Sequence, residues 1–183
     1  MTFNLATIAH ELGKRKARCG NVRIVTVDGK AGSGKTTFAS HLSHVLNDCP
    51  VVSMDSLYNG WDHALEDETF TRIIEQILNP LKLTGCANYQ TYDWHEKMFA
   101  KTTSITNAET VIIEGVGSGH PKLSSFVSLA IWIEADERSL LSRVLQRDGD
   151  EIREDMLRWQ KKEITFFKQF KIKESADYII QAQ

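Results

Sequence analysis

Short apolar runs alternate along the chain with stretches whose apolar residues recur at helical spacing. The runs are rich in β-branched residues, which is typical of buried strands, and they cover residues 22–27, 51–54, 111–114, 129–134 and 178–180. Helical spacing covers about residues 66–78, 136–147 and 151–170, and another helix is expected after residue 34. Because parallel strands need long crossovers, this alternation predicts an α/β fold whose five-stranded parallel sheet lies between two helical layers.

A further amphipathic helix is predicted over residues 3–18, where Leu5, Ile8 and Leu12 recur at helical spacing. Its C-terminal end carries the basic residues Lys14, Arg15, Lys16 and Arg18. Such a cluster could bind phosphate, but cations at the negative end of a helix dipole are the simpler interpretation.

Length and composition restrict the number of domains and the class of partner. The 183 residues, 42% hydrophobic and 25% charged, suit one globular domain, so we expect a single domain over residues 1–183. The 22 basic and 24 acidic residues leave a formal charge of -2, which disfavours a nucleic-acid partner. No apolar run approaches the roughly 18 residues that a membrane-spanning helix needs, so a membrane partner is not expected either.

Three cysteines form an odd number without metal-ligand spacing. They favour a reducing, cytoplasmic setting. The oligomeric state stays open, with a homodimer as one alternative.

A glycine-rich turn between the first predicted strand and the next helix matches the phosphate-binding pattern G-x-x-x-x-G-K-[ST]. It consists of Gly29, Lys30, Ala31, Gly32, Ser33, Gly34, Lys35 and Thr36, followed by Thr37. The glycines let backbone N–H groups point inward as an anion nest, and the helix start adds the positive end of its dipole. We expect these nine residues to bind ATP, with Lys35 on the β- and γ-phosphates and the Thr36 hydroxyl on Mg²⁺. The competing dinucleotide motif fails because it needs glycine at position 37.

Three carboxylates stand at the ends of predicted strands: Asp28, Asp55 and Glu114. Since the carboxyl ends of parallel strands line the ligand crevice, all three are expected near the phosphates. Asp28 is a candidate for bracing the turn. Asp55 is suited to accept a proton from an acceptor hydroxyl, and Glu114 to serve the metal. A cap or turn carboxylate is the alternative for each.

Arg143 and Arg147 lie four residues apart on the flank of the helix after Asp136. Arginines on a mobile segment can stabilise the charge that spreads over the transferred phosphoryl group, so both are candidate catalytic residues. Solvated helix arginines are the alternative.

Together these segments carry a family resemblance. The order VDGKAGSGKTTFA, VVSMDSLY, VIIEGVGSG, AIWIEADERSLLSRVLQRD and ADYII resembles the uridine kinase and phosphoribulokinase-like branch of the P-loop kinases. The short bacterial uridine kinase-like ATP-binding proteins are the most similar, with residues like those at 58–62 and 89–94. The resemblance implies a P-loop NTPase fold, a helical lid at about 143–160 that closes over ATP, and Asp55 as the catalytic base. It implies phosphoryl transfer more strongly than it implies uridine.

The segment between Asp55 and Glu114 is where such folds place the phosphate acceptor. It is rich in aromatic residues with interspersed carboxylates, which suit a nucleoside or a similar polyol. The candidate acceptor-binding residues are Tyr58, Tyr92, Asp93 and Trp94. The buried aromatic core of an ordinary subdomain explains the same pattern equally well.

Glu163 falls on the apolar stripe of the last long helix. A buried charge needs a partner, and the spacing does not choose between Arg158 and Lys162.

We therefore expect a Mg²⁺-dependent kinase that moves the ATP γ-phosphate to a hydroxyl of a nucleoside-like or other small acceptor. A nucleotide-dependent regulatory ATPase or switch without such an acceptor is the main alternative. A nucleic-acid end kinase is disfavoured by the charge balance.

Overall fold

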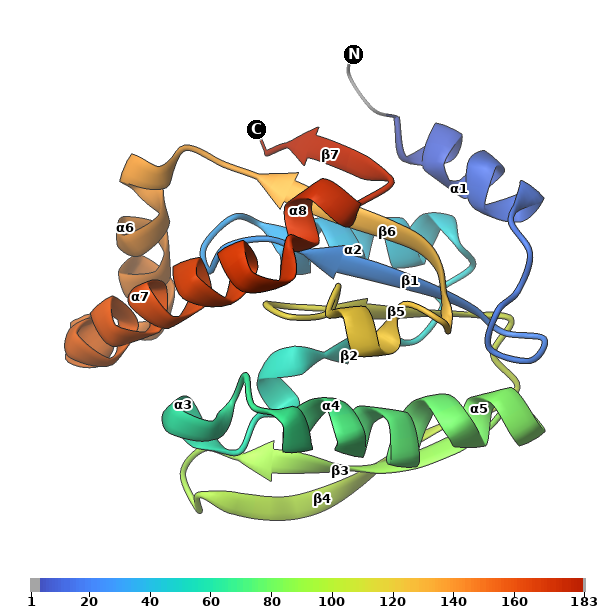
Figure 1. The fold of residues 1–183 in the computed structure, drawn as a ribbon, viewed down its shortest axis with the longest axis horizontal. Coiled ribbons are helices and arrows are strands. Elements are labelled where there is room, and N and C mark those ends of the chain that lie inside the picture. The colour runs from blue at the N-terminus through green and yellow to red at the C-terminus, as the bar shows by residue number, and fades with distance from the viewer. Residues whose placement is uncertain (1–3, 183) are drawn as a thin grey trace.

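The computed structural model describes residues 4–182 and contains a five-stranded parallel sheet of order β2-β5-β1-β6-β7 (Figure 1). The bounds are Arg23–Asp28 for β1, Val51–Ser53 for β2, Thr110–Glu114 for β5, Val127–Glu134 for β6 and Tyr178–Gln181 for β7. All five predicted strands and the α/β fold are confirmed. Ser53 and Val27 both lie beside Glu114, so the carboxyl ends of three strands meet at one edge of the sheet.

Both faces of the sheet are buried, and side chains alternate between them. In β1, Val25 and Val27 pack toward the helices α1 (Leu5–Lys14) and α2 (Lys35–Val45), whereas Ile24 packs into the opposite layer. A parallel sheet covered on both sides explains why its strands are apolar runs in the sequence.

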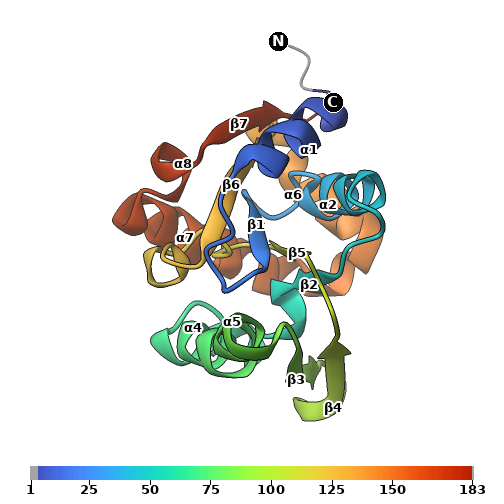
Figure 2. The same cartoon turned by 90° about the vertical axis from the view of Figure 1, so that its right-hand side faces the viewer.

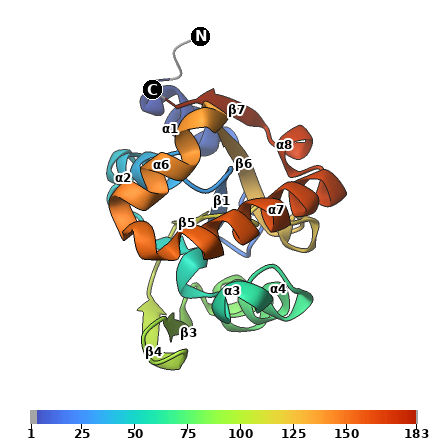
Figure 3. The same ribbon diagram turned by 90° about the vertical axis from the view of Figure 1, so that its left-hand side faces the viewer.

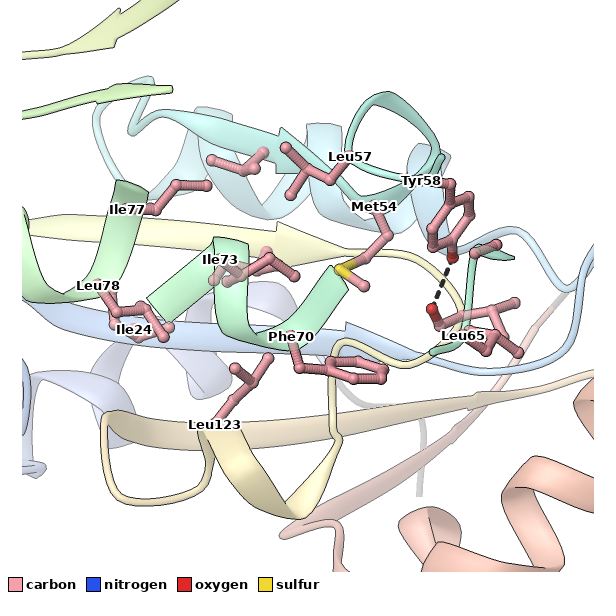
Figure 4. Packing of buried hydrophobic residues seen from close by; sticks show 14 of the residues in the cluster. Ile24, Met54, Leu57, Tyr58, Leu65, Phe70, Ile73, Ile77, Leu78 and Leu123 are labelled. Atoms are coloured by element: carbon pink, nitrogen blue, oxygen red, sulfur yellow. Dashed lines mark hydrogen bonds between the residues drawn. The ribbon is translucent and has the colours of Figure 1, made fainter. Parts of the chain in front are cut away.

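The opposite layer is built on a helical rod made of α4 (Asp67–Ile73), a π-helical turn (Ile74–Leu78) and α5 (Asn79–Thr84). Figure 4 shows its buried side chains packed on those of the sheet and of a later loop. The rod continues beyond the predicted end at residue 78, and Pro80 lies in the first turn of α5, directly after the π-helical turn. It ends at Gly85, whose φ is 73°.

An antiparallel hairpin of β3 (Ala87–Asp93) and β4 (Met98–Ile105) lies beside this rod, apart from the main sheet (Figure 2). The sequence pattern does not predict it. Ala87, Tyr89 and Ile105 join the core, while most other side chains of the hairpin are at least partly exposed. A hairpin buried on so little of its surface needs few apolar residues, and it therefore lacks the continuous run of a core strand.

The N-terminal helix is shorter than predicted. α1 ends at Lys14, and the predicted start at residue 3 lies outside the described residues. Arg15 forms an ion pair with Asp177 at 2.9 Å, and Arg18 donates a hydrogen bond to the Val127 carbonyl at 3.2 Å. The helix-dipole interpretation therefore applies to Lys14 alone.

The C-terminal part places two helices across the carboxyl ends of the strands (Figure 3). They are α6 (Glu137–Asp148) and α7 (Arg153–Phe170), joined by Gly149 and a 3-10 turn (Asp150–Ile152) and followed by α8 (Ile172–Ser175). The remaining short elements are 3-10 turns at Met54–Ser56 and Pro121–Leu123 and α3 (Gly60–His63). Within residues 4–182, no helix combines the length and apolarity needed to cross a membrane.

Candidate active site

The predicted phosphate-binding loop lies between β1 and α2, at the carboxyl edge of the sheet. Gly29, Gly32 and Gly34 have φ values of 147°, 79° and 92°, which residues other than glycine rarely adopt. Lys35 is only 7% exposed, and its Nζ donates to the Lys30 carbonyl within the loop at 2.8 Å. Ser33 Oγ is buried without a hydrogen-bond partner among residues 4–182. The loop thus has the curled backbone and the buried polar groups that a phosphate cradle requires.

Gly32 fixes how closely the loop approaches α6. A Cβ there would lie 2.4 Å from the Leu140 carbonyl oxygen and 3.1 Å from Val144 Cγ2. Gly32→Ala combines this clash with left-handed strain of about 1–2 kcal/mol, so we expect the melting temperature to fall by about 5 °C or more. Gly34→Ala is the matched variant, because it adds similar strain but no atom lies within 4 Å of the new Cβ. Equal losses in thermal unfolding would contradict the close-approach argument.

The two residues predicted to serve a metal are brought together. The Thr36 hydroxyl lies 3.3 Å from both carboxylate oxygens of Glu114. Ser53 lies beside Glu114 in the sheet, and its side chain helps to lower the pKa of this carboxylate. Burial, together with the negative charge of Asp55, raises the pKa of Glu114. A hydroxyl and a carboxylate facing the phosphate loop are the oxygen donors that Mg²⁺ prefers, so this pair fits a metal bound with the phosphates.

Asp28 braces the floor of the site. Its carboxylate accepts hydrogen bonds from the backbone amides of Gly29 at 2.7 Å, Gly117 at 3.2 Å and Gly119 at 2.8 Å. The residue is 1% exposed, and burial raises its pKa to about 6 despite these donors and the nearby charge of Lys35. These bonds tie the start of the phosphate loop to the loop after β5.

Asp55 follows β2 at the mouth of the site, in the 3-10 turn Met54–Ser56. Its side chain reaches solvent, yet surrounding protein raises its pKa against the opposing charges of Lys35 and Arg147. Its backbone carbonyl accepts a 3.0 Å hydrogen bond from the Trp94 indole. The hairpin therefore holds the backbone that carries this carboxylate.

The two candidate arginines differ in their relation to the site. Arg147 forms a two-pronged contact with Asp148, with both N–O distances 2.6 Å, and its charge acts on Asp55 and Glu114. Arg143 lies one turn earlier on α6, is exposed, and acts on Asp136 at the start of the helix. Both side chains are exposed to solvent, and of the two it is Arg147 whose charge acts on the carboxylates of the site.

Two of the four predicted acceptor residues are committed to the fold. Tyr58 is 2% exposed, and its hydroxyl donates to the Val116 carbonyl at 2.6 Å (Figure 4). Asp93 accepts from the amides of His95 and Glu96 at 2.9 and 3.1 Å, which caps the hairpin turn and lowers its pKa. The Tyr58 hydroxyl is thus buried and engaged, whereas both bonds of Asp93 go to Oδ1 and leave its Oδ2 available.

The other two predicted residues belong to an aromatic cluster at the mouth of the site. Tyr92 packs edge-on against Trp94 with ring centroids 5.4 Å apart. Trp94 lies 5.3 Å from Trp61 of α3, and Trp61 lies 5.8 Å from Trp159 of α7. Trp159 lies on the buried side of its helix, and only the fold shows that this side meets the segment after Asp55.

The partner of Glu163 is neither of the two cations that the spacing suggested. Its Oε2 accepts a 3.0 Å hydrogen bond from the backbone amide of Ala31 in the phosphate loop. Arg158 pairs instead with Asp155, and Lys162 donates to the carbonyls of Trp61 and Asp62. Every residue except proline has a backbone amide, so no pattern of side chains in the sequence could have identified this partner of Glu163.

Burial raises the pKa of Glu163 to about 7 from an ordinary value near 4.5. A folded-state pKa above the unfolded one means that the proton is favoured by folding, so this stabilisation is complete below about pH 4.5 and is lost as the pH rises through 7. Glu163→Gln cannot titrate. We expect the melting temperature of the wild type, relative to this variant, to fall across that window, and a constant difference would contradict the prediction.

Comparison with known proteins identifies the family and supports the fold. A model of the AAA domain family matches residues 25–166. A uridine kinase from Borrelia duttonii (strain Ly) is 25% identical over 139 residues, which are 69% of this chain and 68% of that protein.

Two solved structures share the fold. A protein described as a possible uridine kinase from Bacillus stearothermophilus has a TM-score of 0.59 at 18% identity, covering 88% of this chain and 89% of that one. A protein described as a "putative fructose transport system kinase" from Silicibacter sp. TM1040 has a TM-score of 0.67 at 21% identity, covering 97% of this chain and 98% of that one. The resemblance to P-loop kinases of the uridine kinase branch is confirmed, and the chain belongs to the AAA domain family of P-loop proteins.

Proposed function

We propose that the protein is a Mg²⁺-dependent phosphotransferase that moves the γ-phosphate of ATP to a hydroxyl group of a small, nucleoside-like acceptor. The observation that carries this proposal is the place of Asp55. Its carboxylate lies at the mouth of the phosphate loop, within electrostatic reach of Lys35 and Arg147. A carboxylate in that place is suited to accept the proton of an acceptor hydroxyl as the phosphoryl group leaves ATP.

The roles of the other residues follow from their positions. The amides of residues 29–37 and the Lys35 ammonium hold the phosphates, and Thr36 and Glu114 hold the metal. The bound metal would neutralise charge on the phosphate oxygens. Arg147 closes over the site from the lid at about 143–160, and Arg143 joins it when the lid moves. The exposed Trp94, with Tyr92, lines the acceptor side.

The setting of the protein is part of the same proposal. We take residues 1–183 as a single domain. Cys19, Cys49 and Cys86 are free thiols, which supports a reducing compartment, and we place the protein in the cytoplasm.

A panel of nucleosides and small alcohols, assayed for ADP release with Mg²⁺-ATP, tests the function. We expect one class of acceptor to raise ADP release severalfold and to be recovered with one added phosphate. Steady ATP hydrolysis that no acceptor changes would contradict the kinase and favour the regulatory ATPase.

A further inference from the structure

Helix α7 contacts the phosphate loop and the segment after Asp55 through two adjacent residues, Glu163 and Lys162. On one side, Glu163 accepts the Ala31 amide of the phosphate loop at 3.0 Å. On the other, Lys162 donates to the Trp61 carbonyl of α3 at 3.4 Å and, more closely, to that of Asp62. One short stretch of helix therefore touches the nucleotide loop and the segment that follows Asp55.

A continuous series of contacts leads from the loop to Asp55. Trp159 lies one turn before Glu163 on α7, where its indole lowers the pKa of the Glu163 carboxylate, and its ring lies 5.8 Å from that of Trp61. Trp61 packs against Trp94, whose indole donates to the backbone carbonyl of Asp55. Each of the other links is a hydrogen bond or a ring contact between described residues.

Burial of the Glu163 carboxylate in the core lowers the stability of the fold. Glu163 is 1% exposed, and no ion pair neutralises it within the described part of the chain. A buried carboxylate costs free energy that a leucine of similar size would not. Its hydrogen bond goes to the loop amide, and the Trp159 indole lies close enough to lower its pKa, so the carboxylate supplies a connection between the loop and Trp159 rather than hydrophobic stability.

We propose that Glu163 is a positioning residue that couples the phosphate loop to the base-bearing segment, so that occupation of the loop by nucleotide fixes the placement of Trp61, Trp94 and Asp55. The role of this coupling in catalysis rests on the proposed function, because the residue that it positions is Asp55, the proposed base. The coupling itself concerns only the nucleotide and the protein, and it is measurable without any acceptor.

Tryptophan fluorescence tests the coupling, because Trp61, Trp94 and Trp159 are three of the four tryptophans of the chain. The fourth, Trp132 of β6, packs on Phe167 of α7 and is removed as background by Trp132→Phe. In this background, we expect saturating ATP or ADP to shift the emission and to reduce quenching by acrylamide. Glu163→Ala should lose most of that response even at saturation, with binding verified by calorimetry, whereas Glu163→Gln, which keeps an oxygen acceptor for the amide, should retain more than half.

Control variants separate coupling from damage to the fold. Glu154→Gln changes an exposed glutamate of the same helix and should respond like the parent. If circular dichroism shows that Glu163→Ala does not fold, Trp159→Phe is the substitute variant. It keeps an aromatic ring at this position but removes the indole N–H, so the fluorescence response of the two remaining cluster tryptophans, Trp61 and Trp94, should fall.

Two results would overturn the proposal: a full response in Glu163→Ala at saturation, or no response in the parent when calorimetry shows nucleotide bound. Failure of the acceptor panel together with an intact, Glu163-dependent response would instead refute the kinase while leaving the coupling in place.

Discussion

Asp55→Asn is expected to lower the rate of phosphoryl transfer by about 10²- to 10⁴-fold, the range typical for loss of a positioned general base. Asparagine keeps the size of the side chain but cannot accept the proton. Because the substitution leaves the phosphate loop intact, the dissociation constant for Mg²⁺-ATP should change by less than about threefold. Calorimetry with ATP and transfer assays with the acceptor from the panel measure the two quantities separately.

The pH profile sharpens this prediction. Desolvation by the surrounding protein raises the pKa of Asp55. Because the ionised carboxylate is the active form, kcat/KM of the wild type should rise with pH through that raised pKa. This limb should be missing from the residual activity of Asp55→Asn.

Asp67→Asn is the matched control, because it makes the same chemical change at an exposed position in the first turn of α4. Its activity should stay near that of the wild type. Full transfer activity in Asp55→Asn would show that the base has been assigned to the wrong residue.

Lys35→Met is expected to weaken Mg²⁺-ATP binding by about 10²-fold, because charge-assisted hydrogen bonds to phosphate contribute roughly 1.5–3 kcal/mol each. Lys35 is also the common cation among four acidic groups: its charge lowers the pKa values of Asp28, Asp55, Glu114 and Glu163 against their burial. Methionine keeps the apolar stem but removes that charge. The acids should then hold their protons to higher pH, and the free energy of unfolding near neutral pH should fall.

Lys30→Met gives the comparison within the same loop. The Lys30 ammonium pairs with the exposed carboxylate of Glu137, and such surface pairs contribute at most about 1 kcal/mol. We therefore expect Lys30→Met to lower the affinity for ATP by less than about fivefold. Similar losses in the two variants would mean that the phosphates draw on the total charge of the loop rather than on the ammonium of Lys35.

The sheet and the phosphate loop were predictable because each depends on local chemistry. The strands are apolar runs, and the glycines of the loop stand where the backbone has positive φ. The strand-end carboxylates could be located for the same reason, since the ends of parallel strands must meet at one edge.

What escaped prediction depends on contacts between distant segments. The hairpin from Ala87 to Ile105 buries few of its side chains, and its pattern is therefore that of a polar segment. Tyr58 and Asp93 are polar residues in an aromatic segment, and nothing in their spacing shows that backbone groups already bind them. Glu163 meets a backbone amide 132 positions earlier in the chain, a partner that only the folded structure identifies.

The triple hydrogen bond of Asp28 also has a mechanical consequence. By joining the start of the phosphate loop to the loop after β5, it makes the floor of the site one stiff body. The loop is also joined to α7 through the hydrogen bond from the Ala31 amide to Glu163, and to α6 through the ion pair of Lys30 with Glu137 and the close approach of Gly32. The phosphate loop is therefore tied to the sheet edge at its start and to both C-terminal helices further along.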